Sequence, residues 1–137
     1  MIKKQPAAPR GIRNNNPLNI RIGNTWLGEV PNPTDSDFEQ FVSMRYGLRA
    51  AFVILRRYIR RYQRNTVAKI ISAWAPASEN NTRAYIDTVC GLTGLDPDEM
   101  IDFANREQMC CLVSAMARVE CGQPVKYSEI LAAYDIA

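Results

Sequence analysis

The chain has 137 residues, of which 47% are hydrophobic and 23% are charged. This length and composition fit one compact domain and exclude a disordered chain. The sequence contains no histidine, which excludes Ser-His triads, Cys-His dyads and histidine metal sites. Any chemistry must therefore use carboxylates, amides, tyrosines or thiols, and we expect neither a metal nor a cofactor.

The net charge is only +3, but it is unevenly distributed along the chain. The first 75 residues hold 13 basic and 4 acidic side chains, and the rest hold 4 basic and 10 acidic side chains. Either the chain presents a basic surface to an anionic polymer such as nucleic acid, teichoic acid or peptidoglycan, or its two halves attract each other. No apolar stretch is long enough for a membrane-spanning helix, and the start lacks the apolar core of a signal peptide. We therefore expect no membrane insertion and no signal-directed export.

The first part of the chain is predicted to be irregular. Residues 1–10 contain prolines and alanines and are expected to form a flexible tail, ahead of a single domain over residues 11–137. Residues 11–41 are rich in Asn, Gly and Pro with short apolar runs, which favours a small β-hairpin lobe.

From Met44 to Arg64 the apolar residues recur with helical spacing, which predicts an amphipathic helix. Beside its apolar face runs an arginine stripe, which is typical of a solvated helix face and lacks the interleaved aromatic residues of single-strand nucleic-acid binders. The stripe consists of Arg45, Arg49, Arg56, Arg60 and Arg64.

The remainder is predicted to be helical. One helix runs from Thr66 to Trp74, the next carries Tyr85, Ile86 and Val89 and ends at Gly91 or Gly94, and a last short helix spans 127–134. Between the last two, Asn105 caps a helix from Arg106 to about Cys121, which Gly122 and Pro124 terminate. The four cysteines are Cys90, Cys110, Cys111 and Cys121, and their spacing favours small buried thiols in a reducing compartment.

One carboxylate occupies an unusual position in this pattern. On the helix over 106–121, Glu120 continues the apolar face that begins at Met109, within roughly 20° at about 100° per residue. Burial and the helix C-terminus both disfavour its ionised form. A carboxyl group that stays protonated near neutral pH is what a general acid for glycosidic cleavage requires. The alternative is a surface glutamate on a frayed helix end.

Several sequence blocks resemble a family of small phage virion structural proteins related to the lysozyme superfamily. The blocks are Gly11-Ile-Arg-Asn-Asn-Asn-Pro-Leu-Asn-Ile-Arg21, Trp26-Leu-Gly-Glu29, Phe38-Glu-Gln-Phe41, Trp74-Ala-Pro-Ala-Ser-Glu-Asn80 and Met116-Ala-Arg-Val-Glu-Cys-Gly-Gln123. They are also similar, more distantly, to peptidoglycan glucosaminidases and lytic transglycosylases, in which a helix bearing the catalytic Glu precedes the other blocks. Here the block that corresponds to this helix, Met116–Gln123, comes last in the sequence. The resemblance therefore implies a circularly permuted, lysozyme-like α+β fold that is mainly α with a small β lobe.

This resemblance implies roles for six residues. Glu120 would be the general acid. The candidates for a second carboxylate are Glu29, Asp35, Asp37 and Glu39, of which Glu29 is favoured because it comes just after a sugar-stacking Trp26. Asn16 and Asn19 would bind N-acetyl and hydroxyl groups, and Tyr85 would bind the sugar beside the acid. The sequence departs from the pattern at Leu18, where Gly is expected, and at Cys121, where Asn or Ser is expected.

The leading interpretation is a phage or prophage enzyme that cleaves the β-1,4 glycan bond of peptidoglycan, either as a hydrolase or as a lytic transglycosylase. It would reside in the virion or the bacterial cytoplasm, act on the cell wall and contact other virion proteins. One alternative is an inactive virion structural or cell-wall-binding protein on the same fold. Another is a helical nucleic-acid-binding protein that uses the arginine stripe, although no helix-turn-helix signature supports it.

Overall fold

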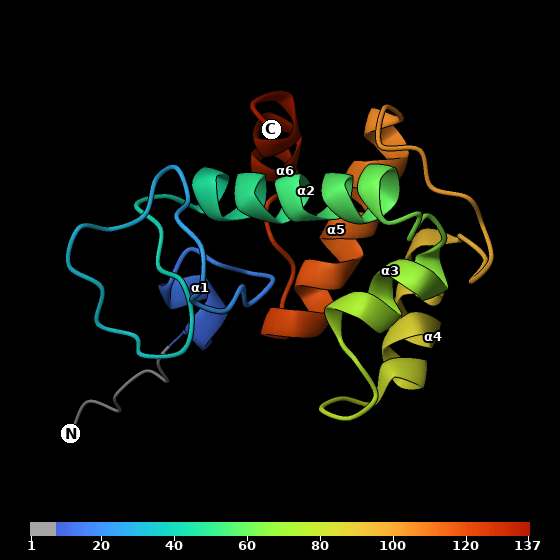
Figure 1. Ribbon diagram of the computed structural model, residues 1–137, viewed down its shortest axis with the longest axis horizontal. Helices are drawn as coiled ribbons and strands as arrows, with labels where there is room; N and C mark the ends of the chain where they lie inside the picture. Colours follow the sequence, from blue (N-terminus) through green and yellow to red (C-terminus); the bar gives the residue numbers. More distant parts are fainter. Residues whose placement is uncertain (1–7) are drawn as a thin grey trace, which may run out of the picture.

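The computed structural model describes residues 8–137. Six helices lie within this part of the chain (Figure 1). They are α1 (Arg10–Arg13), α2 (Met44–Arg61), α3 (Val67–Trp74), α4 (Thr82–Thr93), α5 (Arg106–Cys121) and α6 (Tyr127–Asp135).

Helix α2 is the longest described helix, and in Figure 1 it runs across the molecule with α5 below it and α6 above it. Its inner face buries Leu48, Phe52 and Leu55 completely, as its 3.6-residue apolar period predicts. Phe52 meets the ring of Tyr134 on α6 edge-to-face, with the ring centroids 5.4 Å apart. Helix α2 therefore covers one side of the hydrophobic core.

The structure confirms the predicted limits of α5, the helix that carries Glu120. Asn105 accepts a hydrogen bond from the Gln108 amide at 3.0 Å and so caps the N-terminus. Gly122 ends the helix in the left-handed conformation, with φ at +75°. Between these caps Met109, Leu112 and Met116 are fully buried. Similar local signals set α4, which starts after Asn81 and stops at Gly94.

The prediction of a β-hairpin lobe is wrong for the described residues. Residues 14–43, which we call the N-terminal lobe, contain no strand, only two isolated bridges that pair Arg21 with Phe38 and Glu29 with Phe41. Asn15 and Asn19 take positive φ values of 53° and 54°, which interrupt an extended backbone. The described chain is therefore all-α, with an irregular lobe, in place of the expected α+β architecture.

Side chains hold this lobe together where a strand ladder would otherwise do so. The Asp35 carboxylate accepts hydrogen bonds from the Arg10 guanidinium, the Asn14 side chain and the amides of Asp37 and Phe38. These four donors keep the pKa of Asp35 well below its usual range, chiefly through Arg10. The lobe thus depends on an ionised carboxylate.

The predicted tail over residues 1–10 is only partly covered, because residues 1–7 lie outside the described part. Arg10 begins α1 and binds Asp35, so its position is fixed by the lobe. No helix in the described residues has both the length and the apolar character needed to cross a bilayer.

Candidate functional site

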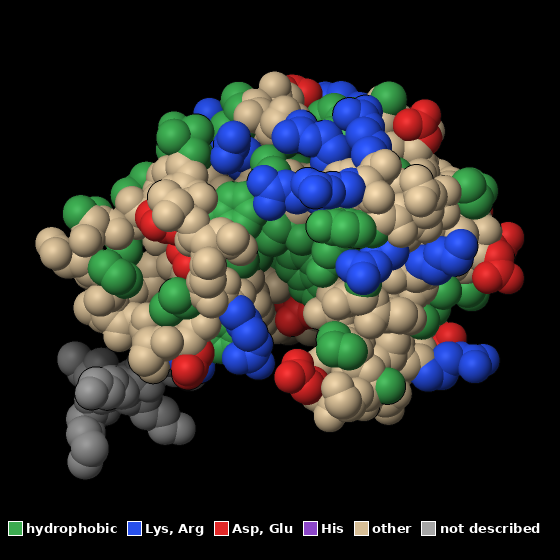
Figure 2. Space-filling model, viewed as in Figure 1, with side chains coloured by type: hydrophobic (Ala, Val, Ile, Leu, Met, Phe, Trp, Pro, Cys, Tyr) green, Lys and Arg blue, Asp and Glu red, His purple; other side chains and the backbone are tan. Residues whose placement is uncertain are grey.

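A cleft of about 440 Å³ lies between the N-terminal lobe and the helices. Figure 2 shows this hollow, with hydrophobic side chains in its floor, basic side chains along its upper edge over α2, and acidic side chains at its lower end. The lobe, α2 and α3, together with the loop after α3, supply its walls. The lining residues are Asn19, Ile20, Arg21, Asn24, Trp26, Ile54, Arg57, Tyr58, Tyr62, Trp74 and Glu79.

Glu120 lies behind the cleft wall formed by Asn19. The Asn19 side-chain amide donates to Glu120 Oε1 and to the Glu120 carbonyl oxygen, each at 3.3 Å. Burial raises the pKa of Glu120, while the bonds from Asn19 and the neighbouring Tyr85 hydroxyl partly offset that rise. The structure thus gives Glu120 the environment of a carboxyl group that retains its proton longer than an exposed glutamate does.

The neighbours of Asn19 fix its position. Gly11 of α1 presses against it, since a Cβ at Gly11 would lie 3.0 Å from Asn19 Oδ1. On the other side of this turn, the Trp74 indole donates to the Leu18 carbonyl oxygen at 3.3 Å. The short turn that carries Asn19 is therefore held between α1, α3 and the end of α5.

Tyr85 comes from α4 and is buried beside Glu120. Its hydroxyl donates to the Met116 carbonyl oxygen at 3.4 Å, and only 6% of the residue is exposed. Burial raises the pKa of Tyr85, and the charge of Glu120 adds to this effect. The hydroxyl therefore stays neutral and acts as a donor next to the carboxyl group.

Trp26 lines the cleft from the lobe side, with 8% of its surface exposed. The Arg57 guanidinium stands 5.9 Å from the centre of its ring. Its buried indole N–H has no hydrogen-bond partner among the described residues. The tryptophan expected to stack on a sugar thus forms part of the wall, beneath an arginine.

Asn16 has a different position from Asn19. It is fully buried, and its side chain binds the Ile20 amide and carbonyl groups, each at 2.9 Å, and the Glu39 carbonyl oxygen at 3.0 Å. The Asn16 amide is thus hydrogen-bonded to backbone groups of the lobe and not directed at a ligand in the cleft. The structure places Asn16 behind the cleft, where it shapes the turn that carries Asn19.

Glu29 lies outside the cleft. Its carboxylate accepts from the Trp26 backbone amide at 2.8 Å and faces Glu39, in a neighbouring cavity of about 180 Å³ that shares Asn24 with the cleft. Glu39 is only 7% exposed, and burial together with Glu29 raises its pKa to about 7. Glu39 therefore keeps its proton up to near neutral pH.

Sequence reasoning did not assign the helical side of the cleft. Ile54, Arg57 and Tyr58 recur at the spacing of one helix face on α2, and that periodicity was the available signal. Glu79 is exposed in the loop between α3 and α4 and lines the cleft. Among the lining residues of the cleft, Glu79 is the one that carries a carboxylate.

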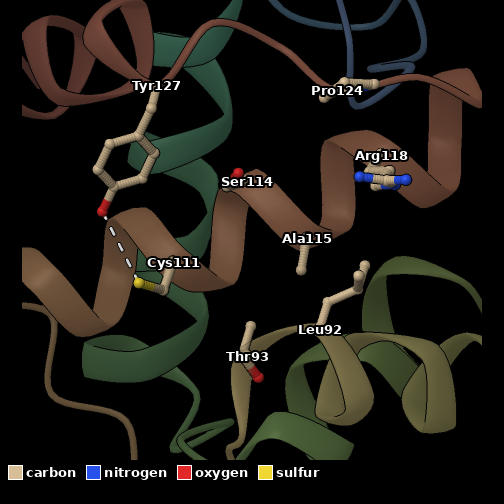
Figure 3. A pocket seen from close by; sticks show the side chains of 8 residues that line it. All are labelled: Leu92, Thr93, Cys111, Ser114, Ala115, Arg118, Pro124 and Tyr127. Carbon is tan, nitrogen blue, oxygen red and sulfur yellow. Dashed lines mark hydrogen bonds between the residues drawn. The ribbon is translucent and has the colours of Figure 1, made fainter.

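A second pocket, of about 270 Å³, lies between α4, α5 and the segment before α6 (Figure 3). In it the Cys111 thiol and the Tyr127 hydroxyl are 3.7 Å apart. Burial and this thiol raise the pKa of Tyr127 to about 12, which keeps its hydroxyl neutral. The pocket shares no lining residue with the cleft. No group of three or more potential metal ligands gathers within residues 8–137.

Comparison with known proteins relates this chain to a phage protein. No protein-family model matches the sequence. Protein P5 of Pseudoalteromonas phage PM2 is 40% identical over 128 residues, which cover 90% of this chain and 78% of that protein. This similarity confirms the phage part of the resemblance and leaves the activity to be argued from the cleft.

Proposed function

The chain belongs to the family of Protein P5 of Pseudoalteromonas phage PM2, and from this premise and the cleft we propose that it is a phage enzyme that cleaves peptidoglycan. Its substrate is the β-1,4-linked glycan strand, and its site is the cleft between the N-terminal lobe and α2. On this proposal the chain is a circularly permuted lysozyme-like domain that acts on the cell wall from the virion or from the infected cell, in contact with other virion proteins.

One observation carries the proposal, namely the half-buried carboxyl group of Glu120 next to an aromatic cleft. Glycosidic cleavage requires a proton on the leaving oxygen while positive charge develops on the sugar. Burial raises the pKa of Glu120, which favours a protonated donor. Asn19 connects this carboxyl group to the cleft, because it both lines the cleft and binds Glu120 Oε1.

The position of Glu29 favours a mechanism with one catalytic carboxyl group. The Glu29 carboxylate is engaged with the Trp26 amide and with Glu39, in the cavity next to the cleft. In the lytic transglycosylase route Glu120 first protonates the leaving oxygen. It then accepts the proton of the sugar's own hydroxyl, which attacks in place of water. The exposed Glu79 is the candidate base if a water is activated instead.

A second candidate function is glycan binding without cleavage, on the same cleft. One observation favours it. The Cys121 thiol beside the acid donates to the Gln123 carbonyl oxygen, so that no polar group from position 121 orients Glu120. A protein of this kind would attach a virion to the wall.

Digestion of purified peptidoglycan tests the two candidates directly. The proposed enzyme releases soluble glycan fragments, and mass spectrometry of their ends distinguishes 1,6-anhydro products from reducing ends. The binding protein sediments with the peptidoglycan and releases no fragments. Absence of both cleavage and co-sedimentation would refute both functions.

A further inference from the structure

Five arginines of α2 and the turn after it have no carboxylate partner among the described residues, and one of them, Arg57, lines the cleft. They belong to the second half of α2 and the turn after it, and we call them the arginine rim: Arg56, Arg57, Arg60, Arg61 and Arg64. The ion pairs found among the described residues involve Arg10, Arg45, Arg83 and Arg106. The charge of the rim is therefore uncompensated within the described part of the chain, and Figure 2 shows basic side chains gathered above the hollow.

Aromatic rings support these guanidinium groups. Arg64 stands over the rings of Tyr58 and Tyr62 at 5.1 and 5.3 Å, and Arg57 stands over Trp26 at 5.9 Å. Stacking of this kind holds a guanidinium plane in place while its N–H edge stays available for carboxylates. The sequence shows no aromatic residue interleaved on the arginine stripe itself, and the structure adds ring contacts from Tyr58 and Tyr62 beside it to Arg64.

The rim is continuous with the cleft. Arg57, Tyr58 and Tyr62 line the cleft from α2, and Arg21 lines it from the lobe. Arg21 is held over the Phe38 ring at 5.1 Å. Glu79 lies in the loop after α3 and also lines the cleft. A ligand in the cleft therefore meets arginines from both the lobe and α2, and a carboxylate from the loop after α3.

We infer that the arginine rim and Arg21 bind the carboxylates of the peptide stems, so that the substrate is stem-bearing peptidoglycan and not a bare glycan. This inference rests on the proposed function. Peptidoglycan stems carry free carboxylates and leave the sugar backbone at regular intervals. Arginine binds carboxylates through paired N–H donors, which makes it suited to this contact. The glycan then occupies the cleft while its stems extend across α2.

The test compares glycan strands that keep their stems with the same strands after an amidase has removed them. The wild-type chain is expected to show a kcat/KM about tenfold higher on stem-bearing strands, because each charge-assisted contact contributes a several-fold preference. In Arg57→Gln/Arg64→Gln the ratio falls to about one, and added salt reduces the wild-type ratio in the same direction. Arg57→Lys/Arg64→Lys, which keeps the charges, retains part of the preference.

Arg83→Gln is the matched control, since Arg83 is an exposed arginine on α4 that pairs with Asp87. It is expected to keep the wild-type ratio. Equal wild-type rates on both strands, or a ratio unchanged in the double variant, would overturn the inference while leaving the proposed function intact. Tighter binding of duplex DNA than of stem-bearing strands, lost in the same variant, would also overturn it.

Failure of the proposed function is recognised separately. If the wild-type chain cleaves neither strand, calorimetry with a soluble disaccharide-peptide and the matching disaccharide still measures recognition. Stronger binding of the disaccharide-peptide, lost in Arg57→Gln/Arg64→Gln, would support stem recognition by a protein that binds without cleaving. Equal binding of the two ligands would contradict it.

Discussion

The Asn19 side-chain amide donates to both the carboxyl Oε1 and the backbone carbonyl oxygen of Glu120, across a sequence separation of 101 residues. This pair joins the N-terminal lobe, whose Asn19 lines the cleft, to the last turn of α5, which carries the proposed acid. Both the accessibility of Glu120 to a substrate and its proton affinity therefore depend on the lobe.

Removal of the Asn19 amide is expected to change the pH profile of cleavage. The bond to Asn19 stabilises the ionised form of Glu120 and lowers its pKa, so its loss raises that pKa. The alkaline limb of activity, where the acid loses its proton, then moves upward by about one pH unit. Asn19→Gly is the suitable variant, because glycine tolerates the φ of 54° at this position.

Tyr85→Phe serves as an independent check, since the Tyr85 hydroxyl also lowers the pKa of Glu120. Its alkaline limb is expected to move in the same direction. The pKa of Glu120 can also be measured directly by carbon NMR of the labelled carboxyl group. A limb that stays in place or moves to lower pH in both variants would contradict the assigned electrostatics.

The carboxyl pair in the lobe predicts a pH dependence of stability. The pKa of Glu39 rises from 4.5 to about 7 in the folded chain, so the folded state holds the proton more tightly than the unfolded state does. The free energy of unfolding then decreases as pH rises from about 4.5 to about 7, and Glu39 contributes no further slope above that. Glu39→Gln is expected to remove this part of the slope and to stabilise the chain at pH 8.

Urea denaturation at several pH values measures this effect. Glu107→Gln is the matched control, because Glu107 is exposed in the first turn of α5 and should leave the slope between these pH values as it is. A Glu39→Gln slope identical to that of the wild-type chain would refute the raised pKa of Glu39.

The contact between α2 and the lobe predicts a large effect of one methyl group. A Cβ at Gly47 would stand only 1.7 Å from the Asn15 carbonyl oxygen, so Gly47→Ala must separate the start of α2 from the lobe. We expect a loss of about 3 kcal/mol in the free energy of unfolding. Gly91→Ala on α4, where a Cβ meets no atom within 4 Å, should instead stabilise the chain by about 0.5–1 kcal/mol. Equal effects of the two substitutions would refute the close approach.

The helical part of the fold was predictable because its signals are local. Asn105 and Gly122 mark both ends of α5 in the sequence, and the apolar period places Glu120 on the inner face. The turn at Asn19 could not be predicted in the same way. Its partner Glu120 is distant in the sequence, and helical periodicity carries no information about such a contact.

The lobe was misjudged for a physical reason. Short apolar runs between turn residues, such as Phe38-Glu-Gln-Phe41, favour strands, but here side chains bind the backbone groups that a ladder would pair. The Asp35 carboxylate and the Asn16 amide satisfy those groups. The short apolar runs also gave no indication that Glu39 is buried beside Glu29.

The role of Glu120 is tested most directly by fragment release from purified peptidoglycan by Glu120→Gln. The substitution keeps the shape of the side chain but removes the transferable proton, so release should fall by about 100- to 10,000-fold while co-sedimentation with the peptidoglycan persists. Glu107→Gln, on the same helix, should match the wild-type chain. Wild-type fragment release by Glu120→Gln would contradict the assignment of Glu120 as the acid.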